Sequence, residues 1–318
     1  MDASRRPVDG FAVGTMLLLC AIWGAQQVAI KLAAHDVAPL VQVTIRSGLS
    51  ALLVAALGAA RGRWIPLGAR HRGPGLLAGA LFGLEFLLIA EGLRNTSASH
   101  LVVFLYTAPV FTALGLHLFV PGERLRRHQW LGVAVAFGGI ALAFLGGGGA
   151  APGAIPGTGA GAPWGDLCAV LAGAAWGATT VVIRTSSLSE APASETLLYQ
   201  LVVGFVLLLA ASLGLRTGPV IFTRVAIASL LFQGVVVSFA SYLAWFWLLR
   251  RYLATRLSVF SFMTPVFGVT FGVVALGDPV TPTFGAGAAL VLAGITIVSG
   301  AGFLRRGAPS RAPSRDAR

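Results

Sequence analysis

Long apolar segments joined by short polar connections run along almost the whole chain. Ten of them are nearly free of charge, and each is close to the roughly 20 residues that a helix needs to cross about 30 Å of hydrocarbon. The pattern predicts membrane-spanning helices at residues 11–31, 39–60, 74–93, 98–120, 129–147, 164–184, 194–214, 226–249, 253–276 and 283–304. Membrane strands of about 10 residues would be much shorter and would alternate strictly. The prediction is therefore an all-α membrane protein.

The second half of the chain repeats the first. Residues 22–31 read IWGAQQVAIK and residues 175–184 read AWGATTVVIR, so a Trp-Gly-Ala motif, a polar pair, an apolar run and a cation recur in order. Residues 109–111 (PVF) likewise return at 265–267, at a shift of 156 that also links other pairs. The two Trp-Gly motifs are five predicted helices apart, and an odd number of crossings gives them opposite directions in the bilayer. The pattern predicts ten transmembrane helices in two inverted five-helix repeats, an arrangement typical of alternating access.

Connecting segments divide the chain into two halves and a tail. Residues 146–163 consist almost entirely of Gly, Ala and Pro and carry no charge, which is typical of a flexible linker. We predict a first repeat at 1–147, an external linker at 148–163 and a second repeat at 164–304. Residues 305–318 are basic and rich in Pro, Ser and Ala, and we expect them to form a cytoplasmic tail near anionic lipid.

Composition and charge support this topology. The chain is 56% hydrophobic and 11% charged, more apolar than a soluble domain could bury. If the N-terminus is cytoplasmic, eighteen of the 23 Lys and Arg residues fall on the cytoplasmic side and four on the outer side, with Arg46 inside a helix. This asymmetry follows the positive-inside rule and predicts that both termini are cytoplasmic. The net charge of +12 therefore reflects topology and does not predict nucleic-acid binding.

Several motifs together resemble a known family. They are the Trp-Gly motif in the first helix of each half, the central prolines in Thr107-Ala108-Pro109 and Met263-Thr264-Pro265, and the acidic residues Glu123 and Asp278. Over residues 11–304 the chain resembles the EamA family of the drug/metabolite transporter superfamily. The resemblance implies a central cavity, a bacterial-type inner membrane and, commonly, export of amino acids or other small metabolites. Residues 121–123 and 276–279 differ from the family's usual Leu-Gly-Glu, so the ends of the fourth and ninth helices are placed only approximately.

Arg46 and Glu85 are charged residues inside predicted helices. Counting 1.5 Å per residue from the outer helix ends puts both roughly 10 to 12 Å deep on the same side. An ion pair between them is geometrically available and would offset their desolvation. Such a pair would either fix helix packing alone, or one of its members would face the cavity and take part in proton coupling or in binding a charged substrate group. The matching residues of the second half are neutral, Ser241 and Gln200, so we expect any titrating step in the first half.

Two tryptophans lie near the middle of predicted helices, away from the interfaces where membrane Trp collects. Trp23 and Trp176 each precede a polar pair, and an indole N–H needs an acceptor. We therefore expect them to line the cavity and to suit a substrate with an apolar or aromatic part, although packing between helices is the alternative. The two polar pairs are Gln26-Gln27 and Thr179-Thr180. Further candidates to complete the site are Tyr106, Tyr199, Gln200, Gln233, Ser238, Ser241, Tyr242, Trp245 and Ser261.

Pro109 and Pro265 occupy matching mid-helix positions. Because proline removes one intrahelical hydrogen bond, each is expected to kink its helix. A symmetric pair of hinges would suit rocking between two states, whereas static kinks would serve packing, and both interpretations stay open.

Enzyme and nucleotide motifs are missing from the sequence. It contains no His-Glu-x-x-His, Gly-x-Ser-x-Gly, Cys-x-x-Cys or ATP-binding motif, and its five histidines lack metal-ligand spacing, so we expect no metal site and no cofactor. The prediction is a secondary active transporter of a small molecule among membrane lipids, with protons as a candidate coupling ion and an open oligomeric state. Export is preferred and import is the alternative. A non-transporting scaffold or a lipid-modifying enzyme is a further alternative.

Overall fold

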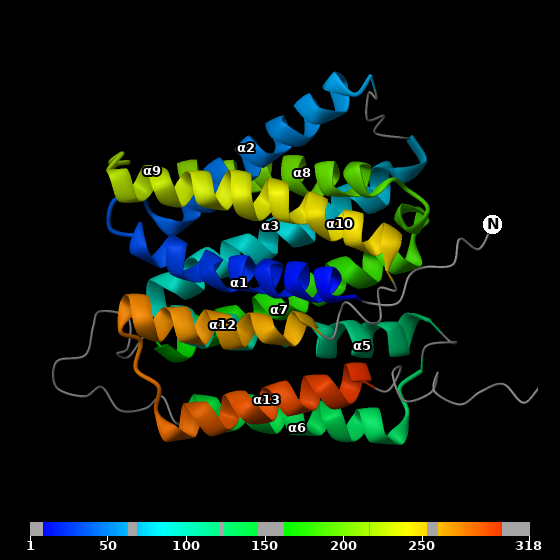
Figure 1. The fold of residues 1–318 in the computed structure, drawn as a ribbon, viewed down its shortest axis with the longest axis vertical. Coiled ribbons are helices and arrows are strands. Elements are labelled where there is room, and N and C mark those ends of the chain that lie inside the picture. Colours follow the sequence, from blue (N-terminus) through cyan, green and yellow to red (C-terminus); the bar gives the residue numbers. More distant parts are fainter. Residues whose placement is uncertain are drawn as a thin grey trace, which may run out of the picture.

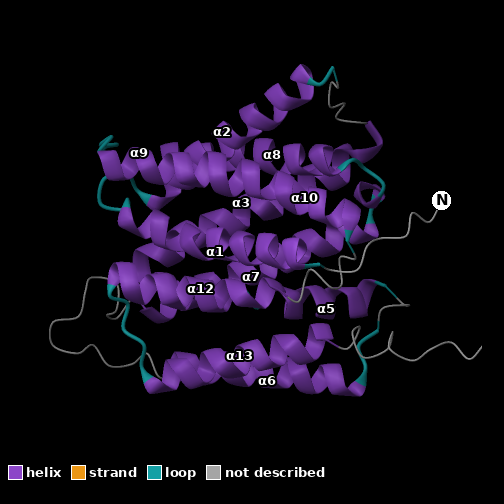
Figure 2. Ribbon diagram, in the orientation of Figure 1, coloured by secondary structure: helices purple, strands orange, loops and turns teal. Residues whose placement is uncertain are grey.

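A computed structural model describes residues 9–62, 69–120, 124–145, 162–215, 217–252 and 260–300. In these residues helices are joined by short connections, and none of them lies in a β-strand (Figure 2). The all-α prediction is therefore confirmed. Glu123, the tail at 305–318 and all but the last two residues of the predicted linker at 148–163 lie outside the described residues.

Helices of the first half begin and end close to the predicted boundaries. They are α1 (Gly10–Leu32), α2 (Pro39–Ala60), α3 (Arg72–Asn95), α4 (Ala98–Leu105), α5 (Ala108–Phe119) and α6 (Arg127–Leu145). Asp9 caps α1, because its Oδ1 accepts a 2.8 Å hydrogen bond from the Ala12 amide that would otherwise lack a partner. Pro39 begins α2, at the position where a missing amide hydrogen has least cost.

The second half contains two π-helical stretches in addition to its α-helices. Its helices are α7 (Ala162–Thr185), α8 (Ala193–Gly214), α9 (Arg224–Leu231), α10 (Tyr242–Arg251), α12 (Met263–Phe271) and α13 (Pro282–Gly300). A π-helical stretch, Phe232–Ser241, joins α9 to α10, and a second one, Gly272–Leu276, continues α12. The predicted helix at 226–249 is therefore a composite of α9, the first π-helical stretch and α10. Such stretches occur frequently at functional sites.

The predicted helix at 98–120 is broken. α4 and α5 are separated at Tyr106 and Thr107. Pro109 explains the break, because it lacks an amide hydrogen and its ring would collide with the carbonyl of Leu105 one turn earlier. The Thr107 hydroxyl instead donates to the Phe104 carbonyl oxygen at 2.6 Å. The sequence predicted a kink in the helix at Pro109, and the structure shows an interruption of the helix instead.

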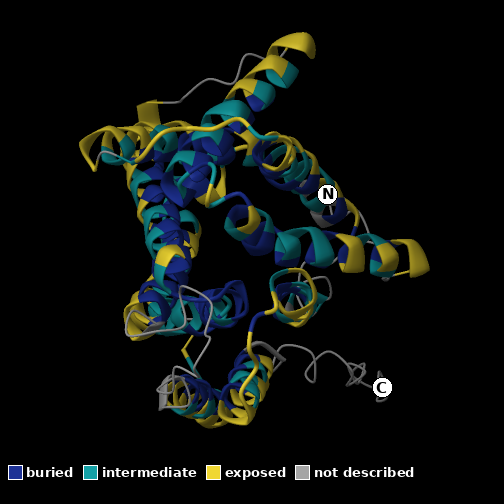
Figure 3. Ribbon diagram, turned by 90° about the vertical axis from the view of Figure 1, so that its left-hand side faces the viewer, coloured by how far each residue is buried: buried dark blue, intermediate teal, exposed yellow. Residues whose placement is uncertain are grey.

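By length and composition, seven helical segments of the described chain can cross a membrane. They are Gly10–Leu32, Pro39–Ala60, Ala69–Asn95, Ala98–Phe119, Pro163–Thr185, Ala193–Gly214 and Arg224–Trp245. Met263–Leu276 and Pro282–Val298 are shorter apolar helices. Exposed residues lie on the outside of the bundle (Figure 3), among them Leu52, Leu118 and Leu213 at 71% to 74% exposure. An apolar exterior around satisfied helical backbones suits lipid, and the protein is a multi-pass membrane protein.

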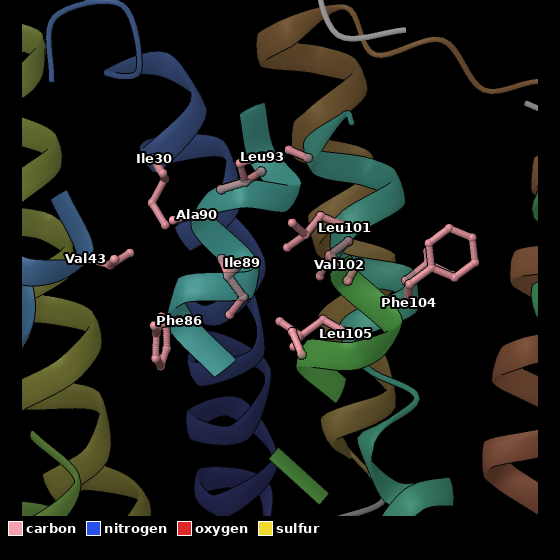
Figure 4. Packing of buried hydrophobic residues seen from close by; sticks show 14 of the residues in the cluster. Ile30, Val43, Phe86, Ile89, Ala90, Leu93, Leu101, Val102, Phe104 and Leu105 are labelled. Atoms are coloured by element: carbon pink, nitrogen blue, oxygen red, sulfur yellow. The ribbon is translucent and has the colours of Figure 1, made fainter. Parts of the chain in front are cut away.

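Helices from the two halves are intermixed in one bundle (Figure 1). α13 lies along α6, α3 packs on α7 and α8, α2 packs on α8, and α1 packs on α12. The main hydrophobic core includes Ile30, Val43, Ile89 and Leu101 of the first half (Figure 4). Phe284 of α13 belongs to the same core. The halves therefore share one interior instead of forming separate domains.

The two Trp-Gly motifs make equivalent close contacts. A Cβ atom added to Gly24 of α1 would lie 2.8 Å from the Gly268 nitrogen and 2.9 Å from the Thr264 carbonyl oxygen of α12. A Cβ atom added to Gly177 of α7 would lie 3.0 Å from the Thr112 nitrogen and 3.1 Å from the Ala108 carbonyl oxygen of α5. Thr112 and Ala108 occupy the positions 156 residues before Gly268 and Thr264. Small residues permit such close backbone approach. The first helix of each half therefore packs on the proline-bearing helix of the other half.

Candidate functional site

A cavity of about 380 Å³ lies among helices of both halves. All ten residues predicted to bind a substrate line it. They are Trp23, Gln26, Gln27, Tyr106, Trp176, Thr179, Thr180, Gln200, Tyr242 and Trp245. Glu85, Ser261, Pro109 and Pro265 line it as well. The volume falls in the range of sites that enclose a small organic molecule.

Helical spacing explains why residues of one short motif meet at the cavity. Positions three and four apart lie on the same face of a helix, so α1 directs Trp23, Gln26 and Gln27 to one side. α7 does the same with Trp176 and its polar pair at 179–180. The glycine that follows each tryptophan lies on a different face, against the neighbouring helix. Each Trp-Gly motif therefore combines a cavity wall with a helix contact.

Aromatic side chains form two walls of the cavity. Trp23 and Trp245 meet edge to face, with centroids 6.0 Å apart and planes at 79°. Tyr106 and Trp176 meet in the same manner at 5.3 Å and 87°. The indole of Trp23 donates a 2.8 Å hydrogen bond to the Ser241 hydroxyl oxygen. The expected partner of this indole is therefore supplied by the π-helical stretch rather than by the neighbouring polar pair.

Four further sequence candidates lie outside the lining of the cavity: Tyr199, Gln233, Ser238 and Ser241. Gln233 is fully buried and donates to Gln42 Oε1 at 2.8 Å, which ties the π-helical stretch to α2. Tyr199 lies against Gly75 of α3, where an added Cβ atom would meet its ring at 2.6 Å. The position of a residue along its helix did not distinguish these packing residues from cavity residues. Which face of a helix points to the cavity depends on how the helix packs against its neighbours.

Arg46 and Glu85 do not form the ion pair that the sequence allowed. Among the described residues no ion pair joins them, although the two groups attract each other through space. Arg46 is 1% exposed, its Cζ lies 3.8 Å from the centre of the Phe86 ring, and its Nε and Nη2 have no partner among the described residues. The guanidinium stacks on an aromatic face, a favourable geometry for arginine, and this stacking replaces the direct pair. Glu85 lines the cavity, whereas Arg46 does not.

Polar contacts join the two halves at the end of the bundle that carries Lys31. The Lys31 ammonium donates to the carbonyl oxygens of Leu93 and Thr96 at 2.5 Å and 2.7 Å, at the end of α3. The Thr96 hydroxyl in turn donates to Asp166 Oδ1 of α7 at 2.5 Å, and His100 Nδ1 lies 3.0 Å from Asp166 Oδ2. Asp166 is 2% exposed. This network was not predicted from the sequence, although Asp166, an acidic residue near the start of α7, was a signal for it.

Two further polar contacts between the halves involve acidic residues. The Ser99 amide donates to Asp278 Oδ2 at 2.8 Å. At the end that carries the start of α1, the Tyr252 hydroxyl donates to Asp9 Oδ2 at 2.9 Å. Tyr252 occupies the position 156 residues after Thr96. Thr96 donates to Asp166 near the start of α7, and Tyr252 donates to Asp9 at the start of α1. Both halves therefore place a hydrogen-bond donor for an acidic residue at this position.

Both halves of the chain are similar to known transporters. The model of the EamA-like transporter family matches residues 10–145 and again residues 163–300. The chain belongs to the EamA-like transporter family. It is 24% identical over 276 residues to "Uncharacterized transporter YoaV" of Bacillus subtilis, covering 86% of this chain and 91% of that protein. It is 29% identical over 304 residues to "Probable amino-acid metabolite efflux pump" of Salmonella typhimurium, covering 91% of this chain and 94% of that protein.

A third relative and a solved structure agree with this assignment. The chain is 24% identical over 268 residues to "Uncharacterized inner membrane transporter YedA" of Escherichia coli K12, with 81% of each chain covered. A structure described as "Crystal structure of protein" has a TM-score of 0.63 and 20% identity, covers 94% of this chain and 99% of its own, and shows that the fold is shared. The family match and the names of these relatives show that this EamA-like protein is a membrane transporter and not an enzyme.

Proposed function

We propose that this EamA-like protein is a secondary active carrier that exports amino acids or other small metabolites across a bacterial-type inner membrane by alternating access. The cavity carries the proposal, because matching residues of both halves line it: Trp23 and Gln27 on α1, and Trp176 and Thr180 on α7. In carriers with inverted repeats the substrate commonly binds where the repeats meet.

Ten transmembrane helices in two inverted repeats, 1–147 and 164–304, form the second part of the proposal. A twofold relation between halves accounts for the equivalent contacts of Gly24 and Gly177. It also accounts for the pair α6 and α13, in which Gly139 and Gly294 are equivalent positions, 155 residues apart. Added Cβ atoms there would lie 2.7 Å from the Gly287 carbonyl oxygen and 2.6 Å from the Gly132 carbonyl oxygen. The separate family matches to each half support the same relation.

The positive-inside distribution supports cytoplasmic termini, an external linker at 148–163 and a cytoplasmic tail at 305–318. Single cysteines placed in the linker and in the tail test this topology in intact cells. The linker cysteine should react with a membrane-impermeant maleimide from outside, and the tail cysteine should react only after permeabilisation. The reverse pattern would overturn the proposed orientation.

Export rests on two observations outside the geometry. One is the family resemblance, and the other is the Salmonella typhimurium relative whose name describes an amino-acid metabolite efflux pump. Import on the same fold is the alternative. Flux in vesicles of defined orientation separates the two, because an exporter should load inside-out vesicles under the driving gradient and an importer should load right-side-out vesicles.

Glu85 is the proposed coupling or charge-binding residue. Its side chain lines the cavity and is 7% exposed. A carboxylate at membrane depth is costly unless it serves binding or proton transfer. With protons as the coupling ion, Glu85→Gln should abolish the pH dependence of transport. The matched control is Glu91→Gln on the same helix, because Glu91 pairs with Arg94 at 2.9 Å and its side chain is 35% exposed.

Pro109 and Pro265 are the proposed hinges. Both line the cavity, and Pro109 follows the observed break between α4 and α5. If these prolines permit rocking between two states, replacing both by alanine should lower turnover more than it lowers substrate affinity. Normal turnover in the double variant would leave them with a static role.

Solute counterflow in proteoliposomes tests the proposed function. The panel should contain amino acids, aromatic metabolites and cationic organic compounds, each at two pH values. A carrier exchanges labelled external solute for unlabelled internal solute without any other energy source. Exchange of at least one solute that depends on the reconstituted protein supports the proposal, and the lack of exchange for every solute contradicts it.

A further inference from the structure

The cavity lining contains one carboxyl group and no basic side chain among the described residues. Glu85 supplies this carboxyl group. Arg46 of α2 is stacked on Phe86 and is not one of the lining residues. An opposite charge on the ligand would compensate a desolvated carboxylate, whereas a second negative charge would add to its cost.

An unused hydrogen-bond acceptor accompanies this carboxylate. Gln27 is 3% exposed and lines the cavity, and its Oε1 is buried without a hydrogen-bond partner among the described residues. Leaving a buried acceptor unpaired is unfavourable, so a ligand that donates hydrogen bonds would be favoured here. A carboxylate and a free amide oxygen together suit an ammonium group, which donates and does not accept.

Aromatic side chains line much of the rest of the cavity. Trp23 with Trp245 and Tyr106 with Trp176 stand at nearly right angles within each pair, and Tyr242 also lines the cavity. Aromatic faces attract cations, most strongly when water is excluded. The same faces bury an apolar or aromatic group, so one site can hold both parts of an aromatic amine.

We propose that the cavity selects an organic monocation, a protonated amine joined to an aromatic or similarly bulky apolar group, over the zwitterionic amino acid with the same side chain. Glu85 is its counter-ion and Gln27 accepts from its ammonium group. An amino-acid carboxylate would find no cationic partner among the described lining residues. The inference rests on the proposed function, because it takes the cavity as the transport site and narrows the substrate to amines.

Three probes that share a phenyl ring test the proposal by binding. They are 2-phenylethylamine, phenylalanine and 3-phenylpropionate, titrated into the purified full-length protein at neutral pH with tryptophan fluorescence as the signal. We expect 2-phenylethylamine to bind on the order of 30-fold more tightly than either other probe, as for one desolvated charged hydrogen bond. Equal or tighter binding of phenylalanine or 3-phenylpropionate, or no binding of the amine, would overturn the proposal.

Variants of the counter-ion provide the matched comparison. Glu85→Gln should lose the preference for the amine, Glu85→Asp should retain most of it, and Glu91→Gln should leave it unchanged. The aspartate variant keeps the test informative where the glutamine variant does not fold. A preference that survives in Glu85→Gln would overturn the role of Glu85 as the counter-ion.

Counterflow with the same probes separates this inference from the proposed function. Exchange of amino acids without binding of the amine would overturn the cation proposal and leave the carrier intact. Selective amine binding without exchange of any solute would contradict the proposed carrier, while the binding preference of the cavity would stand.

Discussion

Replacing Gly24 by alanine should disturb the packing of α1 on α12. The new methyl group would lie 2.8 Å from the Gly268 nitrogen and 2.9 Å from the Thr264 carbonyl oxygen, closer than carbon normally approaches either atom. Both are backbone atoms of a helix and cannot rotate away. Overpacking of this kind costs about 1–3 kcal/mol, and the helix would have to shift by several tenths of an ångström to relieve it.

Thermal unfolding of the purified protein in detergent measures this cost. A loss of about 2 kcal/mol corresponds to a Tm several degrees lower, at roughly 2–4 °C per kcal/mol for domains of 150–250 residues. Gly177→Ala should act in the same direction, since its methyl group would meet equivalent atoms of α5. Gly14→Ala on α1 is the matched control, because an added Cβ atom there meets nothing within 4 Å.

The difference in Tm between Gly24→Ala and Gly14→Ala tests whether α1 packs closely on α12. Gly14→Ala should be neutral or slightly stabilising, because alanine favours a helix by up to about 1 kcal/mol relative to glycine. If Gly24→Ala is as stable as Gly14→Ala, the close contact between α1 and α12 does not exist as described. The twofold relation that rests on the equivalent contacts would lose its support at the same time.

Three further predictions concern buried polar groups. Ser241→Ala removes the acceptor of the Trp23 indole and should lower stability by about 1–3 kcal/mol, seen as a lower Tm, whereas an unchanged Tm would show that the indole has another partner. Asp166→Asn weakens the contact with His100 and should likewise lower the Tm, and an equal Tm would show that this network adds no stability. Arg46→Met removes two unpartnered buried donors and should leave stability unchanged or raise it by about 1–4 kcal/mol, whereas a clear loss would show that stacking on Phe86 outweighs the desolvation of the charge.

Sequence alone predicted most of the helices and the residues that converge on the cavity. Apolar runs set the helix boundaries because lipid requires a minimum length. The mid-helix position of Trp23 and the polar pair Gln26-Gln27 that follows it predicted a cavity wall, and the repeat extended that prediction to Trp176. These predictions depend on short-range spacing, which the sequence contains directly.

Features that depend on contacts between helices were not predictable in the same way. The stacking of Arg46 on Phe86, in place of a pair with Glu85, is a choice between side-chain rotamers that only the packed neighbours decide. The π-helical stretch at Phe232–Ser241 turns Ser241 toward Trp23, and local sequence gave no sign of it. Helix rotation also separated the lining residue Tyr242 from its buried neighbour Ser241.

Counterflow by variants of one helix tests the central claim, that the cavity between the two halves is the transport site. Trp176→Ala opens a cavity wall, whereas Trp164→Ala changes a side chain on the same helix that is 52% exposed and does not line the cavity. With the solute that wild-type protein exchanges, Trp176→Ala should lose at least about tenfold in exchange rate, as expected for an aromatic contact worth about 1.5 kcal/mol or more. Trp164→Ala should retain the wild-type rate. Equal rates in both variants would contradict the account.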